Sequence, residues 1–339
     1  MKAQLDPEQA WRRLETEKRL SDVVLYGVDW SGRDLSGYLL ERVELSGARL
    51  TGSNLSKIDL QQVKLSGALM TGANLVGASL VEVDFSAAVM DEADLSAVFL
   101  DRCVLSRASL IGSTWVKTDA LGCRFDGCDM ARANLQRWTA TQTDLSTVRL
   151  SGASLLQAYL KGAVLSGQDL RDCDLTMTLF DGAQMERANL SGNALDRTSF
   201  IGTNLKQADL SRVRGRFTAL LGAQLQQADL NGARFEMADA SDACLDACRA
   251  EDSDWQQSVL QRANWKQARM SRARFHYCDL SHADWSGAEA MQTDLSGSNV
   301  HAMQQRDTRW DGALREQVRP TDPVLLQAEQ WQAPHERQT

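Results

Sequence analysis

The feature that most constrains the fold is a period of five residues that runs through most of the chain. From Leu25 to Val300, nearly every fifth residue is Leu, Phe, Met or Trp, and the residue two positions earlier is small or β-branched. The segment Ala73-Asn74-Leu75-Val76-Gly77 shows the repeating unit in full. A period of five fits neither the 3.6-residue repeat of an α-helix nor the two-residue repeat of a half-buried strand. The pattern therefore excludes an amphipathic helical fold and an ordinary sheet.

A ribbon that turns a corner after every five-residue edge does satisfy the pattern. Four edges close a square coil, in which the large residue at each edge centre and the small residue two before it both point inward. Successive coils stack at about 4.8 Å and pair backbone to backbone, as parallel strands do. At that spacing, the stretch from Leu25 to Val300 predicts about 14 coils and a rod about 65 Å long.

This pattern resembles that of the pentapeptide-repeat proteins, and the resemblance covers about four-fifths of the chain. Members of that family form right-handed quadrilateral β-helices. The resemblance therefore implies an all-β fold, a right-handed quadrilateral β-helix (solenoid) of about 14 coils with short N- and C-terminal helices. A helical-repeat fold is disfavoured, because glycine at such regular spacing destabilises helices.

The ends of the chain lie outside the repeat. Residues 1–20 contain Asp6-Pro7, which is typical of a helix start, so we expect a capping helix from Glu8 to Leu20. A helix that lies on a membrane surface is the alternative for this segment. The repeat domain is expected at residues 21–303.

Residues 304–339 form the third segment. The five-residue frame decays there, and Asp322-Pro323 predicts a second short helix. This tail either caps the last coil or forms a homodimer, because the resemblance implies that family members commonly dimerise through their C-terminal ends.

Several positions depart from the pattern. Trp138 stands at an inward position that is usually small, and the edge centre that follows it is the small Ala140. This indicates a large-for-small exchange that keeps the volume of the core filled. Gly215 replaces a central Leu, and we expect a bulge there. The C-terminal third is expected to have a thinner and less stable core, because three of its edge centres are alanines: Ala240, Ala250 and Ala290.

Cysteine usage and hydropathy predict a cytoplasmic protein. Only Cys244 is expected to face outward, and there is no Cys-x-x-Cys pair. The sequence has no apolar run of membrane-spanning length and no signal-peptide core at its start. The other six cysteines fall in small inward slots: Cys103, Cys123, Cys128, Cys173, Cys248 and Cys278.

The sequence predicts no catalytic residue, cofactor or metal site. The chain has four histidines. His282 and His301 are expected on the same side of adjacent coils, near Asp279, but two surface imidazoles at a fraying end do not by themselves predict a metal site. The glycines are spaced by five, as corners require, and do not form a phosphate-binding loop. An enzyme is therefore not expected.

The outward positions of one face differ from the rest. On the face centred on Leu40, Leu60 and Leu80, apolar residues recur about once per coil, and such a row usually marks a binding partner. The alternative is that single apolar residues are tolerated on a sheet surface. The predicted protein-binding residues, interrupted by Asp59, Asp119 and Asp239, are Leu39, Val81, Phe99, Leu121, Tyr159, Leu179, Ile201, Ala219, Leu221 and Val259.

Charge supplies a competing hypothesis. The formal net charge is −8, from 45 acidic and 37 basic residues, and no basic residue interrupts the acids at Glu82, Asp84, Asp91, Glu92, Asp94 and Asp101. Several relatives mimic duplex DNA. Cross-coil acid–base pairs would cancel such a field, and the twenty-residue spacing predicts them for Glu82/Arg102, Asp242/Arg262, Asp246/Lys266, Asp252/Arg272 and Asp254/Arg274.

These observations favour a non-enzymatic protein-binding rod, a scaffold or adaptor in a bacterial cytoplasm. The resemblance adds attachment to a bacterial secretion system as one setting for this role. The alternative is a DNA mimic that binds a type II topoisomerase such as gyrase and modulates it or protects it from quinolones. Direct nucleic-acid binding is not expected, because basic residues occur only in short bands beside acidic ones.

Overall fold

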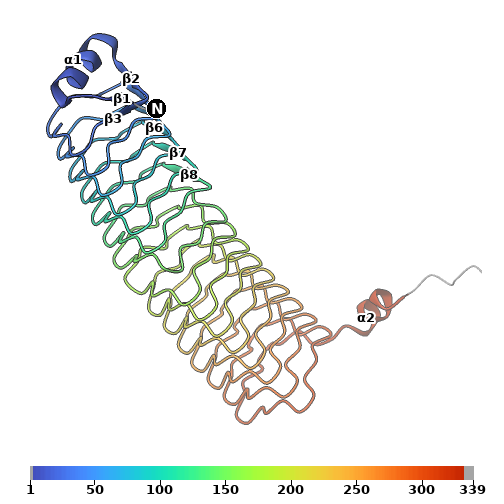
Figure 1. Cartoon of the computed structure of the whole chain (residues 1–339). Coiled ribbons are helices and arrows are strands. Elements are labelled where there is room, and N and C mark those ends of the chain that lie inside the picture. The colour runs from blue at the N-terminus through green and yellow to red at the C-terminus, as the bar shows by residue number, and fades with distance from the viewer. Residues whose placement is uncertain (1–2, 332–339) are drawn as a thin grey trace, which may run out of the picture.

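The chain winds into a long stack of coils with parallel backbone pairing (Figure 1). The computed structural model describes residues 3–331. Pairing keeps a register of twenty residues throughout, as in Leu40 opposite Leu60 and Asn299 opposite Arg319. Since the register runs unchanged from Arg19 to Arg319, 300 residues make about 15 coils. The predicted β-helix is confirmed.

Each coil has four edges, and equivalent edges stack into four walls. We name them by their centres: wall A on Leu40, wall B on Leu45, wall C on Leu50 and wall D on Leu55, each continued at every twentieth residue. Most edges pair through single bridges. Wall A begins with a six-stranded parallel sheet of β2 (Arg19–Ser21), β4 (Leu39–Glu41), β5 (Asp59–Gln61), β6 (Ser79–Val81), β7 (Phe99–Asp101) and β8 (Asp119–Leu121).

The repeating unit explains the corners. Where Asp or Asn precedes a centre, its side chain can accept a hydrogen bond from the N–H two residues on, as Asp94 does from Ser96 at 2.9 Å. The turn closes with a bond such as Ala48 N–H to the Leu45 carbonyl, at 3.0 Å. Its third residue has a positive φ, which glycine adopts without steric cost; Gly47 has a φ of 69°.

The core is filled along its whole length. Trp138 and Ala140 are both fully buried, which confirms the predicted exchange. The central alanines of the C-terminal third are fully buried, and large rings occupy the centres of walls B and D in the same coils, so its lower stability stays a prediction. The rings that contact one another there are Phe235, Trp255, Trp265, Phe275 and Trp285, with centroids 4.7 to 6.3 Å apart.

The bulge expected at Gly215 is also absent. Arg214 pairs in register with Arg234 on the next coil, and Gly215 N–H donates to the Arg234 carbonyl at 2.8 Å. A Cβ at Gly215 would collide with Thr218 Oγ1, so the Thr218 side chain takes the space that a central Leu would occupy. The register is kept because a neighbouring side chain replaces the missing one.

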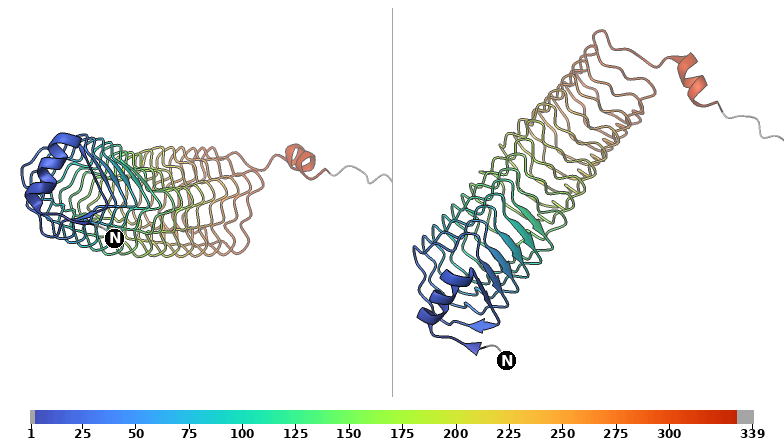
Figure 2. Two further views of the ribbon diagram at one scale, coloured as in Figure 1. Left: turned by 45° about the horizontal axis from the view of Figure 1, so that its top comes forward. Right: turned by 90° about the horizontal axis from the view of Figure 1, so that it is seen from above.

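The N-terminal end is covered by helix α1 (Pro7–Glu17), which lies across the first coil (Figure 2). Its Ala10 and Leu14 are fully buried. The helix ends earlier than expected, because Lys18 adopts a left-handed conformation and Arg19 already joins wall A. A short strand before the helix, β1 (Ala3–Gln4), pairs with β3 (Val23–Val24).

The rod continues past the predicted limit of residue 303. Bridges between coils persist to Arg319, although leucine no longer occupies the edge centres. Trp310 stacks on Trp285 at 5.5 Å, and Arg315 lies 3.8 Å above the Trp310 ring, so side chains of the last coil cover the core. Helix α2 (Pro323–Glu329) projects from this end and has no buried residue (Figure 1).

The four walls differ in continuity. In residues 3–331, the bridge ladder omits one pair on each of three walls: 124/144 on wall B, 149/169 on wall C and 174/194 on wall D. At the gap on wall C, Gln168 occupies a small inward slot and donates to three carbonyls, including that of Leu145 at 2.8 Å. Wall A is paired from Arg19 to Arg319 without a break. It is therefore the most regular surface of the rod.

The aromatic cluster should carry much of the stability of the C-terminal third. Trp255→Ala removes a fully buried ring whose Nε1 donates to Ser253 at 3.0 Å. We expect a loss of about 3–5 kcal/mol, because the cavity cannot collapse fully. Urea unfolding followed by circular dichroism measures this loss. The change Gln256→Ala at the half-buried, outward-facing neighbour should cost less than about 0.5 kcal/mol; equal losses for the two variants would show that the ring does not stabilise the core.

Candidate protein-binding surface

All the predicted binding residues lie on wall A and point outward. They occupy two columns, one immediately before the inward centre and one immediately after it. Four predicted residues are in strands of the wall A sheet, and Tyr159 and Leu179 follow as direct bridge partners. The twenty-residue register therefore gathers residues up to 220 positions apart in sequence onto one surface.

The residues form two patches rather than one continuous row. The N-terminal patch contains Val81, Phe99 and Leu121 on three successive coils. The polar wall A residues Thr139 and Thr141 separate it from the second patch, and Leu39 and Val259 are isolated from both. The central patch spans four successive coils and contains Tyr159, Leu179, Ile201, Ala219 and Leu221.

The two patches expose large side chains to solvent. Leu121 is 58% exposed, Phe99 45% and Ile201 40%. Such large side chains would normally be buried, and clusters of them on a soluble protein usually mark a contact surface.

Sequence reasoning missed the apolar residues at the corner between walls D and A. Phe217 and Tyr277 are exposed there, with Met177 and Met237 in the same column. This corner precedes the outer column of wall A by two residues, so Phe217 extends the central patch beside Ala219. The signal in the sequence is a bulky residue two positions after a centre, where glycine is common.

The predicted acid–base pairs are largely present across neighbouring coils. Lys266 is the exception, because it contacts Asp284 at 3.1 Å while Asp246 accepts from Asn264. Hydrogen bonds from arginine lower the pKa of the Asp242 and Asp252 carboxyls. The confirmed pairs are Glu82–Arg102 at 3.0 Å, Asp242–Arg262 at 2.6 Å, Asp252–Arg272 at 2.7 Å and Asp254–Arg274 at 3.6 Å.

The acidic stretch between Glu82 and Asp101 does not form an acidic face. Its members are distributed around one turn of the rod, with Asp84 on wall B, Asp91 on wall C and Asp94 on wall D. Their fields therefore point in different directions, unlike the regular charge rows of duplex DNA.

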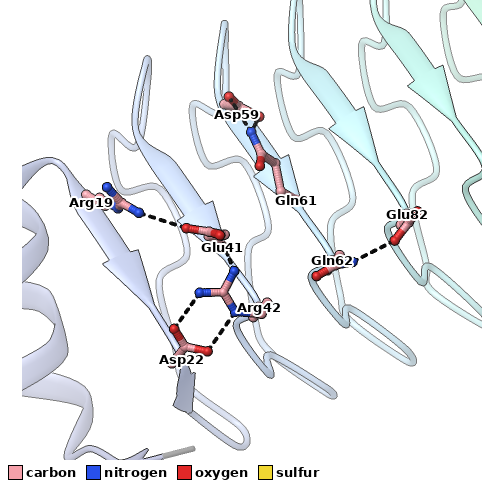
Figure 3. A network of polar contacts seen from close by, with 8 residues as sticks. All are labelled: Arg19, Asp22, Glu41, Arg42, Asp59, Gln61, Gln62 and Glu82. Carbon is pink, nitrogen blue, oxygen red and sulfur yellow. Dashed lines mark hydrogen bonds and ion pairs between the residues drawn. The ribbon is translucent and has the colours of Figure 1, made fainter.

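Acids near the N-terminal end of wall A are also engaged by neighbouring side chains. Figure 3 shows Arg42 between Asp22 and Glu41, with Arg19 donating to Glu41 at 2.7 Å. These hydrogen bonds lower the pKa of the Glu41 carboxyl. The charges on this part of wall A are thus largely neutralised.

The two histidines expected on adjacent coils do come together, but with a different acid. His282 Nε2 lies 3.3 Å and His301 Nε2 lies 3.1 Å from Glu329 Oε2 of helix α2. Asp279 instead accepts hydrogen bonds from its neighbours Gln261 and Asn299. Sequence spacing could not place Glu329 here, because it lies outside the repeat.

This cluster fits a tether better than a metal site. The Asp322 N–H lies 3.1 Å from His301 Nδ1, so Nδ1 accepts that bond and the proton of the neutral ring is on Nε2. Nε2 then donates to Glu329 and offers no lone pair to a metal. The cluster therefore holds the short helix α2 beside wall A.

The cysteines lie where the spacing places them. Cys244 is partly exposed, and the other six are buried. Burial raises the pKa of the Cys128 thiol to about 12 and that of Cys173 to about 11, so both are neutral thiols at physiological pH. Within residues 3–331, neither helix has the length and apolarity needed to cross a bilayer.

Comparison with known proteins identifies the repeat. The family model described as pentapeptide repeats matches eight copies in this chain, over residues 19–56, 58–254 and 256–302. A search of curated proteins gave no match.

Solved structures with related shapes are distant. HetL, a pentapeptide-repeat protein involved in heterocyst differentiation regulation in the cyanobacterium Nostoc, is 18% identical, with 91% of this chain and 94% of HetL covered and a TM-score of 0.23. Full-length QnrB1, a plasmid-mediated fluoroquinolone resistance protein, is 16% identical, with 58% and 93% covered and a TM-score of 0.29. An Azotobacter vinelandii mannuronan C-5 epimerase module is 12% identical, with 90% of each chain covered and a TM-score of 0.24.

Removal of the tether should release helix α2. A seven-residue helix is unstable alone, so His301→Ala should reduce the hydrogen-exchange protection of residues 323–329 to nearly that of an unstructured peptide. The hydrogen bond from His301, followed by the charge of His282, lowers the pKa of Glu329. Because folding lowers the pKa of this carboxyl, its ionised form stabilises the tether at pH values above the ordinary pKa of a glutamate. That contribution is lost as the pH falls through the lowered pKa.

The matched control is His276→Ala, a histidine that contacts Asp294 on wall D. It should leave the protection of α2 unchanged. Unchanged protection in His301→Ala, or protection that rises below pH 4, would contradict the tether.

Proposed function

Because the chain belongs to the pentapeptide-repeat family, we propose that it is a non-enzymatic rod that binds a partner protein on wall A. The observation that carries this proposal is the coincidence of two features. The wall with exposed apolar patches is also the wall whose backbone ladder is unbroken in the described residues. A regular surface loses little conformational entropy when a partner binds.

The dimensions of wall A suit a modest protein interface. The coils from Val81 to Leu221 span roughly 38 Å, and a five-residue edge is at most about 16 Å wide. The resulting area of roughly 600 Å² approaches the 800 Å² or so that each partner buries in a standard interface. The corner beside Phe217 adds further apolar surface. The partner would therefore lie along the rod rather than on its end.

A scaffold or adaptor in the bacterial cytoplasm is the role we propose for this surface, with a secretion system as one setting. The core that would have to open for a catalytic cleft is filled by leucine and aromatic side chains. A rod with a filled core can bind a partner protein along its outer surface. The projecting helix α2 exposes Val324 and Leu325, and Trp331 just beyond it is also exposed; this is where we place a second-copy contact if the protein is a homodimer.

The alternative is a DNA mimic that binds gyrase. It is less well supported, because the acids between Glu82 and Asp101 are spread over four walls and two of them, Glu82 and Asp101, are paired with Arg102. A mimic needs aligned rows of unpaired negative charge, since duplex DNA carries one charge about every 1.7 Å of its axis.

Substitution of the apolar patches tests the proposed function. The triple variant Phe99→Ser, Leu121→Ser and Tyr159→Ser should reduce recovery of the partner from the native host at least tenfold in quantitative affinity capture, because large exposed side chains dominate interface energies. The fold should be retained, since all three side chains point outward.

The matched control changes outward apolar residues of walls C and D: Leu69→Ser, Ile111→Ser and Leu156→Ser. It should leave partner recovery at the wild-type value. Equal recovery with both triple variants would refute binding by wall A, and inhibition of gyrase supercoiling by the purified protein would favour the DNA mimic instead.

A further inference from the structure

One corner of the rod combines two locally unfavourable features. Phe217 has the positive φ that the equivalent corner residue has in other coils, here 58°, and this large apolar residue is 46% exposed and gains little from burial. On wall D, Arg214 lies directly opposite Arg234 on the next coil, and like charges in that position repel each other. The opposed arginines and the exposed aromatic residue are unfavourable in the isolated rod, and such local conflicts concentrate at functional sites.

The arginines here also lack the acidic partners found elsewhere. Within residues 3–331, no ion pair involves Arg214, Arg216 or Arg234, whereas arginines of the following coils pair across the ladder. Asp254, which follows Arg234 in the ladder, contacts Arg274 instead. The positive charge is therefore available to a partner.

These arginines border a surface cavity that opens beside the apolar corner. The cavity has a volume of about 210 Å³ and is lined by Arg214, Gly215, Arg216 and Arg234, with Asp196 and Glu236 at its sides. Gly215 lines the cavity through its backbone, since a side chain at this position would point into the core. Three arginines and two carboxylates leave a net charge of +1, which suits one carboxylate better than a phosphate that carries two charges.

The residues next to the cavity favour a ligand with bulky apolar groups. The Arg216 guanidinium lies 5.2 Å from the Phe217 ring centroid and 3.9 Å from the sulfur of Met237. An aromatic ring, a thioether and a stacked guanidinium form an adaptable surface for apolar side chains. The surface continues through Ala219 into the central patch of wall A.

We propose that this arginine corner, formed by Arg214, Arg216, Phe217, Arg234 and Met237, binds a protein segment that carries acidic and bulky apolar side chains. A carboxylate enters the cavity, and an adjacent apolar side chain packs on Phe217. The inference rests on the proposed function and deepens it, because it specifies the chemistry of the partner that lies on wall A. Duplex DNA fits less well, since a rod with a net charge of −8 repels a dense polyanion.

Peptide binding to the full-length protein tests the proposal. The probe is a fluorescein-labelled synthetic peptide in which Glu alternates with Leu and Trp, and binding is measured by fluorescence anisotropy. We expect this peptide to bind at least tenfold more tightly than a peptide with Lys in place of Glu, or one with Ser in place of Leu and Trp. Affinity should fall as salt is added.

Two variants assign the binding to the corner. Phe217→Gly and Arg214→Glu should each weaken peptide binding at least tenfold. Phe217→Gly should not lower the urea midpoint, because glycine adopts the positive φ without strain, so its effect on binding cannot come from unfolding. The matched control is Tyr277→Gly, an exposed aromatic residue with a φ of 57° in the same corner column, which should bind the peptide as the wild type does.

The proposal is overturned by no binding, by equal binding of the Lys peptide, by wild-type affinity in both variants, or by displacement of the peptide by duplex DNA. Self-association that Phe217→Gly abolishes would assign the corner to a second copy instead and would also overturn it. If the peptide does not bind while the wall A triple variant still loses its partner, only the corner proposal fails. If the triple variant also retains its partner, the proposed function fails as well.

Discussion

The parallel backbone ladder, with its fixed register of twenty residues, is the interaction on which the rest of the structure depends. Many corners are held locally by the Asp or Asn of the repeat, as Asp94 holds the Ser96 N–H, and nearly every edge pairs with the next coil. Because the register is constant from Arg19 to Arg319, position in the sequence specifies the wall and the direction of each side chain. Surface properties can therefore be followed along walls rather than along the chain.

The fivefold period was sufficient to predict the coil, the inward slots and the wall of each outward residue, so Phe99 and Tyr159 were correctly placed on one surface. Features that depend on side-chain conformation could not be predicted. Thr218 fills the space above Gly215, where the sequence suggested a bulge. Glu329 reaches two histidines from a helix outside the repeat, where the period has no predictive value.

Charge and apolar surface are distributed differently along the rod. Most arginines of the C-terminal coils pair with an acid on a neighbouring coil, which suppresses any long-range field. Near Gly215 that pairing stops, while exposed apolar side chains continue around the corner from wall A. An acidic, apolar partner would thus contact a region where unpaired positive charge and an exposed aromatic ring adjoin an unbroken wall.

The most direct test of the twenty-residue register is a pair of distances between spin labels on wall C, measured by double electron–electron resonance. Thr51 and Ser151 are exposed at equivalent corners five coils apart, and Glu251 lies five coils further on. At about 4.8 Å per coil, labels at 51 and 151 should be about 24 Å apart, and labels at 51 and 251 about 48 Å apart. Distances that do not double, or that differ widely from these values, would contradict the stacked four-walled rod.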